Sequence, residues 1–138
     1  MREDYENEKA QANVSAGILR RQQRCKAIVV ENKKPYGNGT HDPPPRQWNS
    51  SMEHLIKTMI SVREGQGELP FGLFGVAGIG LYAKFFLLKN EMNELEAFEL
   101  DDGAYSISDD ESAQVLESKL LAMKVEIDQV QLEEKLSS

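Results

Sequence analysis

A chain of 138 residues has the length of one domain, because domains usually contain about 100–200 residues. Its 16 Lys and Arg against 23 Asp and Glu give a net charge of −7, which argues against a phosphate-binding surface and a nucleic-acid partner. The single cysteine, Cys25, cannot close an internal disulfide. No Cys/His cluster has zinc spacing, so the sequence predicts neither a metal site nor a cofactor.

Residues 1–34 form a predicted N-terminal arm whose second half is basic. The stretch 17–27 contains three Arg and one Lys but no acid, a composition that looks like the end of a plastid transit peptide. Acids near the start of the chain oppose that interpretation, because transit peptides are poor in acids. The arm is therefore either the remnant of a targeting sequence or an exposed, partly helical extension.

Residues 35–50 form a predicted linker, and residues 51–64 a predicted amphipathic surface helix. Three consecutive prolines, Pro43 to Pro45, fix φ and lack an amide hydrogen, which excludes helix and central strand from the linker. Ser50 and Glu53 have the spacing of a capping box, which predicts a helix N-terminus at Ser50. Apolar residues then recur at intervals of three and four. They are Met52, Leu55, Ile56, Met59 and Ile60.

The apolar segment at residues 69–89 is predicted to be a transmembrane helix. Residues 69–88 contain one charge, Lys84, and 20 helical residues span about 30 Å, the thickness of the hydrocarbon layer. Pro70 is compatible with the first turn of a helix, and the long Lys84 side chain can extend to the headgroups. The alternatives are a buried helix, or a buried hairpin of glycine-rich strands, within a soluble domain.

Small residues on one side of this helix predict how it packs. In lipid, helices associate where small side chains let their backbones approach closely. The strict Gly-xxx-Gly spacing is absent, so a larger membrane protein complex is the expected partner and a homodimer is not expected. The predicted helix-packing interface consists of Gly72, Gly75, Ile79, Gly80 and Ala83.

Residues 90–107 form a predicted acidic connector, and residues 108–136 a predicted C-terminal helix. Nine acids and no Lys or Arg lie between residues 90 and 111. Ser108 and Glu111 have capping-box spacing, and the apolar residues beyond them follow the seam of a short coiled coil. This seam packs either on the chain itself or on a partner. The residues predicted to dock a partner are Leu116, Leu120, Met123, Ile127 and Val130.

The sequence contains no catalytic motif, so no catalytic residue is predicted and the chain is not expected to be an enzyme. His41 and His54 have no neighbouring ligand set, and Cys25 has no histidine base or second cysteine beside it. The predicted fold is mainly α. It has a single transmembrane helix, a preceding amphipathic helix, a C-terminal amphipathic or coiled-coil helix, and disordered connectors.

The function predicted from this fold is that of a non-catalytic, single-span accessory subunit that stabilises a larger membrane protein complex in a lipid bilayer. The basic stretch near Cys25 favours an organellar energy-converting membrane. The thylakoid of a chloroplast, with its photosynthetic complexes, is favoured slightly over the mitochondrial inner membrane and its respiratory complexes. Two alternatives are a soluble adaptor and a membrane tether, which recruit partners through the acidic and C-terminal helical segments.

Overall fold

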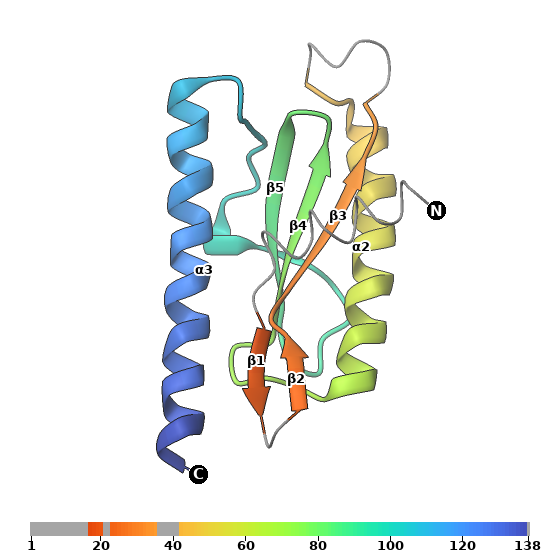
Figure 1. Cartoon of the computed structure of the whole chain (residues 1–138). Helices are drawn as coiled ribbons and strands as arrows, with labels where there is room; N and C mark the ends of the chain where they lie inside the picture. The colour runs from red at the N-terminus through yellow and green to blue at the C-terminus, as the bar shows by residue number, and fades with distance from the viewer. Residues whose placement is uncertain (1–16, 21–22, 36–41, 138) are drawn as a thin grey trace, which may run out of the picture.

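The computed structural model describes residues 17–20, 23–35 and 42–137, and its centre is a mixed sheet with one helix on each face (Figure 1). The strand order is β3-β4-β5-β6, and β7 also pairs with β5. The predicted mainly α fold is therefore wrong, because the chain combines helices with a sheet. The strands of this sheet are β3 (Ile28–Lys33), β4 (Leu73–Ile79), β5 (Tyr82–Leu88), β6 (Glu96–Ala97) and β7 (Tyr105–Ser106).

The segment predicted to cross a membrane at residues 69–89 forms the antiparallel hairpin of β4 and β5. Gly80 has a φ of 59° and is the first of two loop residues, a position where hairpin turns favour glycine. All seven residues of β4 are buried. A strand covered on both faces has no polar alternation, and for this reason its sequence resembles that of a buried helix. Within the described part of the chain, every helix is too short or too polar to traverse a bilayer.

Helix α2 (Pro45–Gln66) connects the parallel strands β3 and β4 and covers one face of the sheet. It begins at Pro45, within the predicted 35–50 linker, because proline is well suited to the first helical position, where its missing amide hydrogen costs nothing. Ser50 is consequently an interior residue and not the predicted N-cap. Trp48, which also fell in the predicted linker, is buried in the core.

The core between α2 and the sheet depends on a close approach at Gly75. Leu55 and Met59 of α2 are fully buried, and both lie over this glycine of β4. A Cβ atom added at Gly75 would lie 2.7 Å from the Met59 Sδ and 3.1 Å from the Leu55 Cδ2. The glycine therefore lets the helix lie directly on the strand.

Helix α3 (Asp110–Ser137) covers the opposite face of the sheet (Figure 1). It begins one residue later than the predicted capping box, because the Asp109 carboxylate, and not Ser108, accepts a hydrogen bond from the Ser112 amide at 2.9 Å. The side chains that α3 buries include Leu116, Met123 and Ile127. The predicted 108–136 helix is thus present, and its apolar seam lies in the core of its own chain.

The predicted N-terminal arm contributes strands to the fold. A two-stranded sheet of β1 (Gly17–Arg20) and β2 (Gln23–Lys26) precedes β3, and Ile18 and Cys25 are buried in the core beneath α3. The Gln66 side chain bonds both backbone groups of Lys26, each at 2.7 Å, which fixes β2 to the end of α2. Residues 1–16 and 21–22 of the predicted arm and 36–41 of the predicted linker lie outside the described residues.

We predict that Gly75→Leu destabilises the chain by about 2–3 kcal/mol, because the new side chain would displace Leu55 and Met59. Thermal and urea denaturation measure the change. Gly65→Ala is the matched control: Gly65 lies in α2 with open space around it, so alanine should stabilise the helix by about 0.5–1 kcal/mol. Wild-type stability of Gly75→Leu would contradict the close approach.

Candidate functional site

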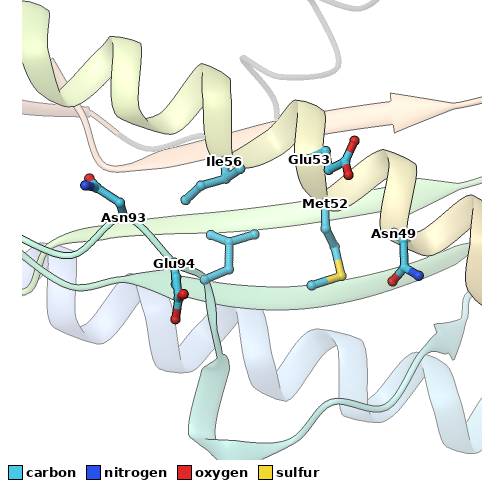
Figure 2. Close-up of a pocket in the computed structure, with 7 residues that line it drawn as sticks. Asn49, Met52, Glu53, Ile56, Asn93 and Glu94 are labelled. Carbon is cyan, nitrogen blue, oxygen red and sulfur yellow. The ribbon is translucent and has the colours of Figure 1, made fainter.

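An open groove of about 420 Å³ lies between α2 and the segment that follows β5 (Figure 2). Its volume falls within the range of about 300–1,000 Å³ that is typical of ligand sites. We call it the α2 groove. Its lining residues are Asn49, Met52, Glu53 and Ile56 of α2, and Asn93, Glu94 and Leu95 of the following segment.

The α2 wall of the groove is the half-exposed flank of an amphipathic helix. Met52 and Ile56 are separated by four residues, so they lie one turn apart on the same side of the helix. Both pack partly against the core that contains Leu55 and Met59. The helix spacing that identified these residues in the sequence therefore locates one wall of the site.

The second wall of the groove is held in place by Arg63. Its Nη1 donates to the carbonyl oxygens of Met92 at 2.6 Å and Lys89 at 3.4 Å, and its Nη2 donates to the Asn93 Oδ1 at 2.8 Å. Asn90 adds a bond from its Nδ2 to the Leu69 carbonyl oxygen at 2.7 Å. Because these bonds fix the backbone around residue 93, the groove has a preformed shape.

The lining of the α2 groove combines an apolar floor with an acidic rim. Met52, Ile56 and Leu95 supply apolar surface and also pack on the core. Glu53 and Glu94 are exposed on opposite walls, and neither forms a salt bridge with another described residue. Such a lining can bury aliphatic groups and attract cations.

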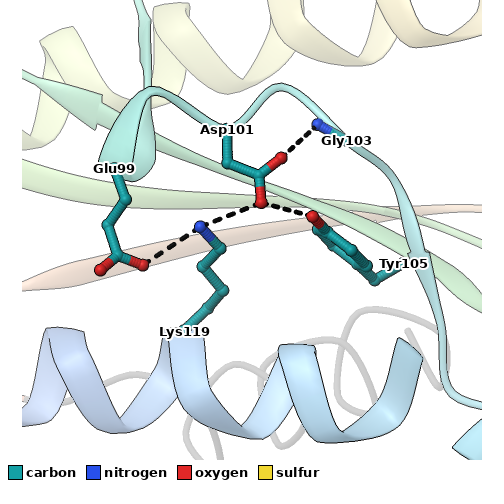
Figure 3. Close-up of polar contacts among 5 residues, drawn as sticks. All are labelled: Glu99, Asp101, Gly103, Tyr105 and Lys119. Atoms are coloured by element: carbon teal, nitrogen blue, oxygen red, sulfur yellow. Dashed lines mark hydrogen bonds and ion pairs between the residues drawn. The ribbon is translucent and has the colours of Figure 1, made fainter. Parts of the chain in front are cut away.

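A second polar feature, which we call the Lys119 clamp, ties the acidic segment to α3 (Figure 3). The side chain of Lys119 is 8% exposed, and its Nζ lies 3.1 Å from both the Glu99 Oε1 and the Asp101 Oδ2. The Tyr105 hydroxyl and the Gly103 amide also donate hydrogen bonds to Asp101. The clamp therefore satisfies a nearly buried ammonium and fixes residues 99–105 on the helix.

These contacts change the proton affinities of the clamp residues. The hydrogen bonds from Tyr105 and Gly103, together with Lys119, lower the pKa of Asp101 to about 2. Burial alone would lower the pKa of Lys119, but its bonds to Glu99 and Asp101 raise that pKa above its ordinary value. Lys119 is thus a charged structural residue and not a neutral amine available as a nucleophile.

The structure separates the predicted helix-packing residues. Gly75 and Ile79 lie on the α2 side of β4, whereas Ala83 of β5 packs against the core on the α3 side. Gly80 forms the hairpin turn. Gly72 has a φ of 92°, and a Cβ atom there would lie 2.3 Å from the Leu88 carbonyl oxygen. The glycines at 72 and 75 therefore allow close packing within the sheet and under α2, whereas Ile79 is an ordinary core residue.

The residues predicted to dock a partner lie on the inner side of α3. Leu116, Met123, Ile127 and Val130 are buried in the core, and Leu120 packs against it. The outer side of α3 carries a different apolar set, which the seam pattern missed because it selects only one side of a helix. The exposed residues are Leu121, Val125, Leu132 and Leu136.

The cysteine and the histidines are the remaining residues that could take part in catalysis or metal binding, and those that the structure describes do not form a common site. Cys25 is buried in the core beneath α3. The His54 Nδ1 lies 2.5 Å from the Lys33 Nζ, on the opposite side of the sheet from the Lys119 clamp. His41 lies outside the described residues. Among the residues that are described, no three His, Cys, Asp or Glu side chains are grouped so that they could hold a metal ion.

Comparisons of the chain with protein-family models, curated proteins and solved structures gave no match. The α2 groove and the Lys119 clamp therefore have to be interpreted from their own geometry.

We predict that Arg63→Ala loosens the second wall of the groove, because three hydrogen bonds to residues 89–93 are lost. The expected destabilisation is about 1–2 kcal/mol. Hydrogen exchange of the amides at residues 89–95 should become faster. Lys57→Ala, on the exposed side of the same helix, should leave exchange in this segment unchanged; equal exchange in both variants would contradict the role of Arg63.

The low pKa of Asp101 predicts how the clamp responds to acid. Because the folded-state pKa lies below the ordinary value of 3.8, the ionised carboxylate stabilises the fold above about pH 4. This contribution is lost as the pH falls towards 2. Urea denaturation at pH 4 and pH 2 should show a smaller acid-induced loss of stability in Asp101→Asn than in the wild type. Glu117→Gln, at an exposed position on α3, should keep the wild-type difference.

Proposed function

We propose that the chain is a non-catalytic interaction module that recruits a partner protein through the α2 groove. The observation that carries this proposal is the combination of an apolar floor, a polar rim and a wall fixed by Arg63. A concave site with apolar lining and a few polar groups that fix orientation is the usual form of a binding pocket. A preformed wall favours binding because less conformational entropy is lost when the partner docks.

The chemistry of the lining favours recognition over covalent catalysis. The seven side chains are two carboxylates, two carboxamides and three apolar groups. None is a Ser, Cys, Lys or His that could act as an activated nucleophile, and both carboxylates are exposed to water, unlike carboxylates that a buried site tunes for catalysis. Carboxamides at Asn49 and Asn93 can instead pair with the backbone of a bound segment, since each has both donor and acceptor atoms.

In this proposal, as in the adaptor hypothesis, the chain recruits a partner protein. The surface that binds the partner is a different one. The adaptor was predicted to bind through its acidic and C-terminal helical segments. In the proposal, Glu94 and Leu95 of the acidic segment join α2, whereas the apolar seam of α3 belongs to the core. The accessory-subunit function and its organellar location stay predictions, without the transmembrane helix on which they were based.

We predict that peptides selected from a random display library against the full chain bind at the α2 groove. Bound peptide should slow hydrogen exchange at residues 49–56 and 93–95. Ile56→Asp should weaken binding at least tenfold, because a carboxylate would enter the apolar floor. Circular dichroism and thermal denaturation verify that this variant is folded.

The matched control is Val125→Asp, which places the same carboxylate at an exposed apolar position of α3. It should bind the selected peptides as the wild type does. Peptides that protect other segments, or that bind folded Ile56→Asp with unchanged affinity, would contradict the proposed function.

A further inference from the structure

Each wall of the α2 groove carries one carboxylate beside the same apolar floor. Glu53 belongs to α2 and Glu94 to the segment after β5 (Figure 2). Met52, Ile56 and Leu95 supply the apolar part of the lining. An unpaired carboxylate on each wall favours cations on both sides of whatever fills the floor. The charge pattern therefore restricts the chemistry of the occupant.

Building on the proposed function, we infer that the α2 groove binds a protein segment in which aliphatic side chains are flanked on both sides by Lys or Arg. The aliphatic side chains cover the apolar floor, and the flanking cations reach Glu53 and Glu94. A segment with acids at the flanking positions is repelled by both walls. An uncharged segment gains the apolar contact alone.

The size of the groove limits the length of this segment. Asn49 and Ile56 are seven residues apart in α2, which corresponds to about 10 Å along the helix axis. An extended chain covers that distance with about three residues. The floor thus fits one or two aliphatic residues, and a segment that crosses it from wall to wall carries the cations on the two sides of these residues.

Partners already present in the fold explain why Glu53 and Glu94 are the carboxylates available to such a segment. Nearby Lys89 forms a salt bridge of 3.0 Å with Glu96, and Arg63 is bonded to the backbone and to Asn93. Lys57 is an exposed residue of α2 that forms no salt bridge with the described residues. Lys89 and Arg63 are therefore engaged elsewhere, whereas Lys57, four residues after Glu53 on the same helix, attracts the Glu53 carboxylate weakly and competes with the occupant there.

Three synthetic peptides test the inference on the full chain. They share a Leu-Leu centre and differ in the residues on its two sides, which are Lys, Ser or Glu. Titration followed by amide chemical shifts should give the tightest binding for the Lys peptide, about tenfold weaker binding for the Ser peptide, and none for the Glu peptide. The advantage of the Lys peptide should shrink at high salt, because exposed charges are screened.

A variant with reversed charges on the rim of the groove provides a second test of the inference. The double variant Glu53→Lys, Glu94→Lys should bind the Glu peptide better than the Lys peptide. The matched control is Glu64→Lys combined with Glu117→Lys. These glutamates are exposed residues of α2 and α3 outside the groove lining, so this variant has the same net charge and should keep the wild-type order.

The outcomes separate this inference from the proposed function. Equal binding of the three peptides at the groove would overturn the requirement for flanking cations and leave the binding role intact. If peptides selected from the random library bind at the groove but the Lys peptide does not, only the inferred occupant is overturned. If neither the selected peptides nor the Lys peptide perturb the groove, both proposals are overturned.

Discussion

The contact of α2 with Gly75 is the constraint on which the rest of the structure depends. Leu55 and Met59 can lie on β4 only because the strand has no side chain at that point. This contact sets the distance between the helix and the sheet. It therefore also determines where the side of α2 that carries Met52 and Ile56 lies. The groove is thus a consequence of how closely the helix packs.

The same packing explains why the sequence predicts a transmembrane helix where the structure has the hairpin of β4 and β5. Both strands of the hairpin bury residues against helices on two faces, and Phe85 and Phe86 point to opposite cores. A strand in this position is apolar throughout, so its composition matches that of a transmembrane helix. The spacing of the glycines predicts one side of a packed helix, but sequence alone does not show that Gly75 faces α2 while Gly80 forms a turn. A buried glycine-rich hairpin was one alternative, and the structure agrees with it.

The helices were more accessible to prediction than the sheet or the site. The apolar residues of α2 and α3 recur at helical spacing, which depends only on local geometry. The α2 groove could be predicted only in part, because its second wall is positioned by Arg63, which bonds to residues 26–30 positions away in the sequence. Long-range contacts of this kind have no periodic signature. Likewise, the sequence does not show which apolar residues of α3 are exposed, because that depends on which side of the helix packs on the sheet.

Most carboxylates of the acidic segment stabilise the fold, but Glu94 lies on the rim of the α2 groove. Glu99 and Asp101 are held by Lys119, Glu96 pairs with Lys89, and Asp109 caps α3. Each of these carboxylates has a defined partner, so the segment is a set of structural contacts more than a solvated connector. Glu94 differs because it lies on the rim of the groove without a salt bridge to the described residues. Arg63 holds the backbone just before Glu94 through its bonds to Met92 and Asn93, so this part of the rim keeps its place relative to α2. A backbone that is already in place favours association, because less conformational entropy is lost when a partner docks.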